Sequence, residues 1–369
     1  MSECSTKTVL CVNVDAPKDQ IGNNLFFDGS LSIQRYDMVK YQTIQKLTEK
    51  MKGFYWNPKE VNLSSDTVDY KGLSEPEKHI FTANLKRQII LDSVQGRSPL
   101  EAFLPICSNT ELESAIIWWA AFEQIHSESY THIIRNIYPD PSKVFDGVFQ
   151  IEEIVNCARD ISKYYDDLIE LNNKYALSGV LTREHKRALW LALVAVNALE
   201  GIRFYVSFLC TWNFAEQGKM EGSAKIVKLI CRDENMHLTL TQHLLNNLPK
   251  EDPDFLEISK ECEEEVVAIY RSVEAQEKEW ADYLFRDGAM IGLNATILKD
   301  YVSYITKRRM KSIGLKYDGE APSADPCPWS GIWIGGKELQ VAPQEVEISS
   351  YVVGRVNTNL DIGNLGIIL

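Results

Sequence analysis

Four carboxylic acids lie within or directly after runs of apolar residues in this 369-residue chain. They are Asp92, Glu123, Glu200 and Glu234. Moving an ionised carboxylate from water into an apolar interior is costly unless the charge is paired or bound to a metal. A common explanation is therefore needed for all four acids.

Two histidines supply that explanation through their spacing. Of the six histidines in the chain, only His126 and His237 have a glutamate three residues before them. On a helix, residues i and i+3 project from one face toward the same point. The pairs Glu123/His126 and Glu234/His237 can therefore each present a carboxylate and an imidazole to one ion.

The two other acids give each pair a matching neighbour. Asp92 precedes Glu123 by 31 residues, and Glu200 precedes Glu234 by 34. Each half is then one carboxylate on one helix and Glu-x-x-His on the next, which is the ligand arrangement of ferritin-like dimetal carboxylate proteins. Six oxygen and nitrogen ligands suit iron or manganese, not a thiolate-rich structural zinc site. The alternative, buried ion pairs such as Glu200 with Arg203, explains one acid at a time but not the matched spacing.

Tyr130 lies four residues after His126 and seven after Glu123, so it shares their helix face. A phenol beside an oxygen-activating dimetal centre can be oxidised. A tyrosine in a buried helix is otherwise a packed aromatic with a hydrogen bond. Periodicity alone leaves both interpretations of Tyr130 open.

The pattern that must position these residues is helical from about residue 32 to 312. We expect helices near 32–50, 75–105, 110–137, 151–175, 182–213, 222–247, 253–282 and 285–312. Ser74 and Asn109 precede acidic first turns, which is typical of helix starts. After residue 313, repeated glycine and proline break any long helix. The sequence predicts an all-α, ferritin-like helical bundle with additional helices at 32–312, an N-terminal arm at 1–31, and an irregular, flexible C-terminal segment at 313–369.

Composition argues against several classes of partner. The chain is 45% hydrophobic and 25% charged, with a formal net charge of -13 and no Lys/Arg-rich run, so we expect neither nucleic acid nor an anionic membrane as partner. The start of the chain lacks a signal-peptide pattern, and the eight scattered cysteines suit reduced thiols in the cytoplasm. The apolar segment 189–210 is long enough to cross a bilayer, but central Glu200 and Arg203 favour a buried core helix.

Longer strings of this sequence resemble the small subunit of class I ribonucleotide reductases. The strings are residues 92–99, 123–136, 197–208, 232–239, 280–285 and 341–347. They occur in the family's order and at its spacing, and the similarity runs from roughly residue 25 to 353. The resemblance implies the small subunit of an aerobic ribonucleoside-diphosphate reductase, an oxidoreductase that makes deoxyribonucleotides only together with a large subunit.

The resemblance also implies roles for individual residues. One metal would be held by Asp92, Glu123 and His126, and the other by Glu200, Glu234 and His237. Two ferrous ions would reduce O2 together, and the oxidised centre would take an electron and a proton from Tyr130, leaving a tyrosyl radical. Phe204, Phe208 and Ile230 match the apolar pocket around that radical. Iron is expected, with manganese as the alternative, because oxygen and nitrogen ligands accept both.

Substrate and catalytic cysteines would lie on the large subunit, so the radical must leave this chain. The resemblance implies transfer through Asp233 and Trp56, then through Tyr351 in the tail, with Glu345 also required. Taken alone, Trp56 could be a packed core residue and Tyr351 an ordinary tail aromatic. The apolar end, residues 363–369, would dock on the large subunit. The family implies a homodimer.

Two other functions are alternatives. A ferritin-like oxidase or monooxygenase would need a substrate cavity beside the metals and no radical tyrosine. A non-enzymatic iron-binding scaffold would need neither. Tyr130, the Trp56–Asp233–His126 set and Tyr351 distinguish these alternatives from the reductase, and Tyr130 also separates this chain from small subunits that carry phenylalanine there and use a manganese/iron oxidant.

Overall fold

The structure is a computed structural model that describes residues 23–29 and 33–335. Within these ranges the regular elements are helices, and the β-type pairings are two isolated bridges, Phe26 with Cys107 and Met290 with Leu293. The predicted all-α fold is therefore confirmed.

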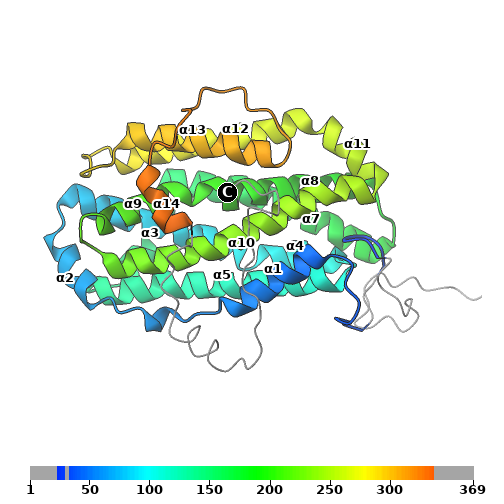
Figure 1. The fold of residues 1–369 in the computed structure, drawn as a ribbon, viewed down its shortest axis with the longest axis horizontal. Coiled ribbons are helices and arrows are strands. Elements are labelled where there is room, and N and C mark those ends of the chain that lie inside the picture. The colour runs from blue at the N-terminus through cyan, green and yellow to red at the C-terminus, as the bar shows by residue number, and fades with distance from the viewer. Residues whose placement is uncertain (1–22, 30–32, 336–369) are drawn as a thin grey trace, which may run out of the picture.

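Four long helical stretches form the centre of the molecule. They are α3 (Glu75–Gln95), α5 (Thr110–Ile137), α8 with α9 (Arg183–Ala198 and Tyr205–Ala215), and α10 (Glu221–Glu251). α3 packs against α5, and α10 packs against α8, α9 and α5. In Figure 1 these helices run along the long direction of the molecule. They are the elements on which the predicted ligands lie.

The remaining helices surround this bundle. α1 (Gln42–Gly53) packs on α5, and α7 (Glu152–Ser178) packs on α8 and α3. α12 (Glu263–Leu284) and α13 (Ala295–Ser312) pack together as an outer layer, at the top of Figure 1. The shorter elements are α2 (Ser64–Gly72), α4 (Ser98–Ala102), α6 (Ser142–Asp146), α11 (Pro253–Glu261), α14 (Gly331–Ile334), and the 3-10 turns Pro58–Glu60, Leu104–Ile106, Val148–Gln150 and Pro328–Ser330.

The helix starts follow the local signals in the sequence. Ser74 and Glu77 form a reciprocal capping box at the start of α3. The Asn109 side chain accepts a 3.0 Å hydrogen bond from the Leu112 amide at the start of α5. α7 ends at Gly179, whose φ of 70° is a left-handed conformation that glycine adopts at low cost. These caps fix where α3 and α5 begin, and hence the register of the side chains along them.

Some helix boundaries differ from the prediction. The first helix begins at Gln42 and not near residue 32, because the buried Glu111 carboxylate accepts the amides of Lys40 and Tyr41 just before it. The segment 253–282 is two helices that separate at Cys262. The last long helix begins at Ala295, since Gly288 and Gly292 before it have φ values of 149° and 81° that interrupt a helix.

The predicted continuous helix at 182–213 is interrupted by a π-helical turn, η4 (Leu199–Arg203). Glu200 lies in this turn. Arg309 of α13 is buried against it and donates hydrogen bonds to the Gly201 carbonyl oxygen at 3.0 Å and to the Tyr205 hydroxyl at 3.1 Å. Such widened turns are frequent at functional sites, because they redirect side chains that a regular helix would place elsewhere.

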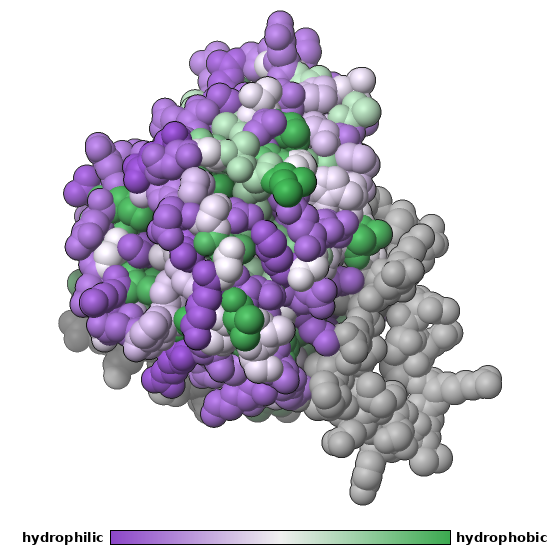
Figure 2. Space-filling view, turned by 90° about the vertical axis from the view of Figure 1, so that its left-hand side faces the viewer, coloured by the Kyte–Doolittle hydropathy of each residue, from purple (hydrophilic) through white to green (hydrophobic). Residues whose placement is uncertain are grey.

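The long apolar segment is a core helix, as predicted. The stretch Arg183–Ala215 has the length and hydropathy of a membrane span, yet its most apolar window is wholly buried inside the protein. The face drawn in Figure 2 is mainly hydrophilic, with hydrophobic side chains in separate spots. Cys210 and Cys231 are buried free thiols, as core packing requires.

Candidate metal centre

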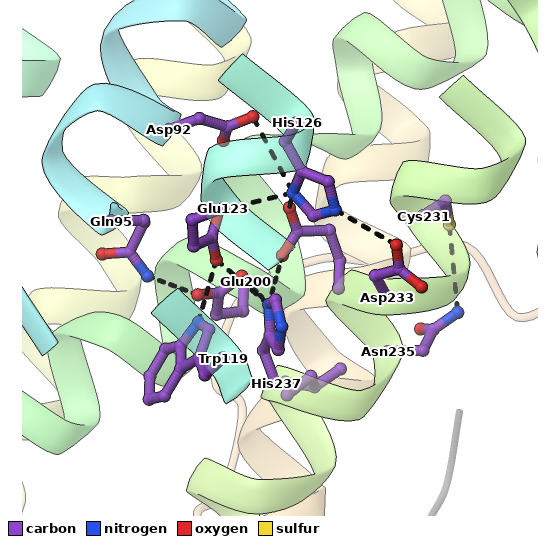
Figure 3. A network of polar contacts seen from close by, with 12 residues as sticks. Asp92, Gln95, Trp119, Glu123, His126, Glu200, Cys231, Asp233, Asn235 and His237 are labelled. Atoms are coloured by element: carbon purple, nitrogen blue, oxygen red, sulfur yellow. Dashed lines mark hydrogen bonds and ion pairs between the residues drawn. The ribbon is translucent and has the colours of Figure 1, made fainter. Parts of the chain in front are cut away.

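The six predicted metal ligands come together inside the central bundle. They form two overlapping groups, Asp92 with Glu123, His126 and Glu234, and Glu123 with Glu200, Glu234 and His237. In each group, one potential ligand atom from every residue lies within 4.8 Å of the others. None of the six side chains is exposed to solvent. Figure 3 shows five of the six, labelled, facing one another from α3, α5, η4 and α10.

Each histidine points its Nδ1 atom at the carboxylates. His126 Nδ1 lies 3.3 Å from Glu123 Oε2 and 3.2 Å from Glu234 Oε1. His237 Nδ1 lies 3.1 Å from Glu123 Oε1 and 3.2 Å from Glu234 Oε2. Glu123 and Glu234 thus present one oxygen to each histidine, which is the arrangement needed for carboxylates that bridge two ions.

The two outer acids lie on opposite sides of this pair. Asp92 Oδ2 is 4.0 Å from His126 Nδ1, and Glu200 Oε2 is 4.0 Å from His237 Nδ1. Asp92 is therefore associated with His126, and Glu200 with His237. The pairs Asp92/His126 and Glu200/His237 agree with the sets that the resemblance implies, and the assignment of each residue to one metal stays a prediction.

Burial and mutual repulsion shift the pKa values of the carboxyl groups in the cluster. Burial, followed by the charge of Glu123, raises the pKa of Asp92 well above its usual range. Burial and the charge of Glu234 do the same to the pKa of Glu200. Burial and Glu123 raise the pKa of Glu234 to about 8. Burial alone would also raise the pKa of Glu123, but hydrogen bonding to His126 and His237 outweighs it, so this pKa falls to about 2.

The donor set fits two divalent cations. Several of its oxygens make no hydrogen bond to any residue in the described ranges: both Asp92 oxygens and Glu200 Oε2. Buried polar atoms without partners are rare and call for an explanation. Once ionised, the four carboxylates would carry four negative charges, which two divalent ions would balance. The site is therefore a buried Asp/Glu/His metal-binding site.

The alternative explanation, an ion pair between Glu200 and Arg203, is wrong. Arg203 Nη2 pairs with Asp160 at 2.5 Å, and Arg203 Nη1 donates to Gln276 Oε1 at 2.7 Å. Its guanidinium group is therefore engaged by α7 and α12. Glu200 is left for the metal-binding group.

Tyr130 is completely buried on α5, one turn after His126. Its hydroxyl makes no hydrogen bond within the part of the chain that the structure describes. Burial and the negative charge of Asp92 raise the pKa of the Tyr130 phenol well above its usual range. The phenol therefore keeps its proton at neutral pH, and Asp92 is the carboxylate that acts on it most strongly.

A hydrogen-bonded chain leads away from the centre on the side of His126. His126 Nε2 lies 3.3 Å from Asp233 Oδ2, and Trp56 Nε1 donates to the same oxygen at 2.8 Å. Arg232 Nε donates to the other Asp233 oxygen at 3.1 Å. Trp56 is only 1% exposed. The three residues of the predicted transfer set, Trp56, Asp233 and His126, are thus in direct contact.

Three further residues beside the ligands were not singled out from the sequence. Trp119 Nε1 donates to Glu123 Oε1 at 2.8 Å, and Gln95 Nε2 donates to Glu200 Oε1. Tyr165 donates its hydroxyl proton to Gln95 Oε1 at 2.8 Å. Helical spacing could have found two of them, because Trp119 precedes Glu123 by one turn and Gln95 follows Asp92 by one turn. Nothing local marks Tyr165, which reaches the site from α7.

The other predicted residues divide into two sets. Phe204, Phe208 and Ile230 are fully buried, and the Phe204 and Phe208 rings stack at 5.6 Å. Their place around Tyr130 stays a prediction. Glu345 and Tyr351 lie outside the described residues.

Comparison with known sequences finds one family and several close relatives. The family model described as "Ribonucleotide reductase, small chain" matches residues 35–318. The ribonucleoside-diphosphate reductase subunit beta of Haemophilus influenzae is 50% identical over 357 residues, which cover 93% of this chain and 95% of the relative. The ribonucleoside-diphosphate reductase 1 subunit beta of Escherichia coli O157:H7 is 50% identical over 94% of this chain and 96% of the relative. The subunit beta of bacteriophage T4 is 39% identical over 94% and 95%.

Comparison with solved structures finds the same helical fold. The R2 subunit of a ribonucleotide reductase from Clostridium botulinum aligns with a TM-score of 0.78 and 24% identity, over 89% of this chain and 98% of the other. The dimanganese(II)-NrdF protein of Streptococcus sanguinis aligns with a TM-score of 0.64 and 20% identity, over 83% of this chain and all of the other. At these identities the likeness establishes the fold, and the predicted ferritin-like bundle is confirmed.

Proposed function

This chain belongs to the ribonucleotide reductase small-chain family and is the beta subunit of a ribonucleoside-diphosphate reductase, and we propose that it generates a radical on Tyr130 and delivers it to the large subunit. The observation that carries this proposal is the environment of Tyr130. Its protonated phenol is buried on the same helix as Glu123 and His126, and the charge of Asp92 acts on it.

The metal-binding groups define which residues would hold the cofactor. Asp92, Glu123 and His126 would hold one ion, and Glu200, Glu234 and His237 the other, with Glu123 and Glu234 able to bridge them. We propose iron, with manganese as the alternative, because carboxylate oxygen and imidazole nitrogen suit both metals. When bound, two such ions supply the electrons for reduction of O2 and the oxidising equivalent that Tyr130 stores.

The protein's own part is to hold Tyr130 ready for oxidation and then to protect the radical. Because the phenol is protonated, its oxidation must release a proton as well as an electron. Asp92 is the carboxylate whose charge acts most strongly on Tyr130, so we assign it as the proton acceptor. Complete burial keeps water and reductants away from the radical. Phe204, Phe208 and Ile230 would form the apolar surface around it.

Transfer of the radical would begin along the chain of hydrogen bonds from His126 through Asp233 to Trp56. An acceptor carboxylate between an imidazole and an indole can hold both rings in place and accept a proton from the indole. The proposed continuation uses Tyr351 and Glu345, which lie outside the described residues. The apolar end, residues 363–369, would bind a groove on the large subunit.

The setting of the enzyme follows from the family. We propose a homodimer in the cytoplasm that uses O2 and works with a separate large subunit, since the relatives are named as beta subunits of the reductase. The catalytic cysteines would then lie on the large subunit. The cysteines of the described residues are buried free thiols.

Reconstitution of turnover tests this function. The metal-loaded protein is combined with its cognate large subunit, and the deoxyribonucleotide formed from a ribonucleoside diphosphate is measured. We expect turnover with the wild-type protein and none with Tyr130→Phe. Tyr270→Phe is a matched control, because Tyr270 is equally buried but bonds to Asn197 and not to a ligand. Full turnover in Tyr130→Phe would refute the proposed role.

A further inference from the structure

Gln95 is the neutral side chain that contacts Glu200 directly. It lies on α3 one turn after Asp92, is completely buried, and donates a hydrogen bond from Nε2 to Glu200 Oε1. Figure 3 shows its amide directed at Glu200 from the side opposite His237. The other oxygen, Glu200 Oε2, has no hydrogen-bond partner among the described residues and lies 4.0 Å from His237 Nδ1. One oxygen is therefore held and the other is left for a metal.

The orientation of the Gln95 amide depends on Tyr165. The Tyr165 hydroxyl donates to Gln95 Oε1 at 2.8 Å, so the amide oxygen faces α7 and the amide nitrogen faces Glu200. An amide turned by 180° would place its oxygen against the carboxylate, which repels it. Burial and the charge of Glu200 raise the pKa of Tyr165 well above its usual range, so the phenol remains a donor at neutral pH.

The surroundings of Tyr165 limit its movement. Tyr165 is 2% exposed, and its ring contacts the Phe103 ring at 5.8 Å. Phe103 in turn stacks on Trp119, which donates to Glu123. Phe103 thus packs against both Tyr165, which orients the Gln95 donor to Glu200, and Trp119, which donates to Glu123. Tyr165 also differs from Tyr130, whose hydroxyl bonds to nothing in the described ranges.

We propose that Tyr165 and Gln95 are positioning residues that hold Glu200 with Oε1 occupied and Oε2 directed at the metal-binding group of Glu123, Glu234 and His237. This inference rests on the proposed function, because it takes Glu200 as a ligand. It predicts a selective effect. The second group, in which Asp92 and His126 replace Glu200 and His237, accepts no hydrogen bond from Gln95 among the described residues, so its affinity should change less.

Titration of the metal-free protein with Mn(II) tests the proposal without any turnover. Free Mn(II) is measured by EPR, and the titration reports the number and affinity of the bound ions. Removing a partner that orients a metal ligand typically weakens metal affinity about 10- to 100-fold. We therefore expect two ions per wild-type chain, and in Tyr165→Phe one ion weakened by about tenfold or more with the other nearly unchanged.

Tyr270→Phe is the matched control for this titration. Tyr270 is a buried tyrosine that donates to the Asn197 amide oxygen at 2.7 Å, and Asn197 donates to Thr241 and not to a carboxylate. Both variants lose one buried hydrogen bond of the same kind, so both should lower thermal stability to a similar extent. Only Tyr165→Phe should change the Mn(II) affinity, which separates positioning from a structural role.

The outcomes separate this inference from the proposed function. If the wild-type protein binds two ions and both Tyr165→Phe and Gln95→Met bind them equally well, the inference is wrong and the function stands. If the wild-type protein does not bind two ions, the ligand assignment fails and the inference fails with it. Should Tyr165→Phe not fold, the Gln95→Met titration decides by the same criterion. Equal weakening of both ions would also contradict the inference, because the effect would not be confined to the Glu200 group.

Discussion

The Trp56 indole nitrogen lies 2.8 Å from Asp233 Oδ2, although 177 residues separate the two in sequence. The same oxygen lies 3.3 Å from Nε2 of His126, whose other nitrogen faces the metal-binding carboxylates. One carboxylate oxygen therefore links a buried indole to a histidine of the metal-binding group. A tryptophan held only by core packing would not need this acceptor.

Trp56→Phe should separate formation of the radical from its use. Phenylalanine keeps an apolar ring in the core but removes the donor to Asp233 and the oxidisable indole. We expect the Tyr130 radical to form upon loading with iron and O2, while nucleotide reduction with the large subunit falls to background. The two readouts are the EPR signal and the turnover assay.

Trp190→Phe is the control for this variant. Trp190 is a buried tryptophan on α8 whose indole nitrogen has no partner among the described residues. It should lose neither radical nor turnover. Turnover of Trp56→Phe close to that of Trp190→Phe would show that the Trp56–Asp233 contact is structural only.

Metal loading should raise the free energy of unfolding. Any ligand that binds only the folded state stabilises it, by about 2.7 kcal/mol for each ion present at 100 times its dissociation constant. Urea unfolding of the loaded and metal-free proteins at pH 7 measures the difference. Equal stability of the two forms would show that the cluster does not bind the added metal in the folded state.

The metal-free protein should lose stability as the pH rises from 6 to 8. The pKa values of Asp92 and Glu200 are raised in the folded state, and that of Glu234 is raised to about 8. The folded protein therefore retains protons that the unfolded chain releases, which lowers the free energy of unfolding with increasing pH. The lowered pKa of Glu123, about 2, acts only below this window.

Urea unfolding of the metal-free protein at pH 6, 7 and 8 measures this trend. The raised pKa of His126, where hydrogen bonds to Asp233, Glu123 and Glu234 outweigh burial, acts in the same direction above its usual value of 6.5. The metal-loaded protein should show a flatter profile, because the ions replace the retained protons. Stability of the metal-free protein that rises with pH would contradict the description of the cluster.

Arg309→Met should destabilise the π-helical turn that carries Glu200. The substitution removes the donors to the Gly201 carbonyl oxygen and to the Tyr205 hydroxyl. Leaving a buried polar group unsatisfied costs about 1–3 kcal/mol, so we expect the free energy of unfolding to fall by about that amount. Lys307→Met on the exposed face of α13 is the control, expected within about 0.5 kcal/mol of wild type. Identical unfolding curves for the two variants would rule out this role of Arg309.

The residues of the metal-binding groups could be predicted from the sequence because their signals are local. Glu123 and His126 are one helical turn apart, as are Glu234 and His237, and acids in apolar segments require a partner. The caps at Ser74 and Asn109 are local for the same reason, since a cap is formed by the residue beside the helix start. Each of these features needs only a few neighbouring residues to be recognised.

Features that depend on distant residues could not be predicted. The π-helical turn at Glu200 is supported by Arg309 from another helix, and apolar periodicity does not reveal it. The partner of Arg203 is Asp160, 43 residues away, and not the nearby Glu200. Tyr165 reaches Gln95 across 70 residues. In each case the partner is chosen by helix packing, which a single sequence does not display.

The most direct test of the account is the radical on Tyr130. Metal-free protein is loaded with Fe(II) without oxygen, O2 is admitted, and iron content and the EPR spectrum are recorded for wild type and Tyr130→Phe. Because the Tyr130 hydroxyl has no hydrogen bond among the described residues, the variant should fold and bind iron like the wild type. We expect two irons per chain in both proteins and a phenoxyl signal in the wild type alone. Two bound irons with no radical in either protein, or the same radical in both, would contradict this expectation.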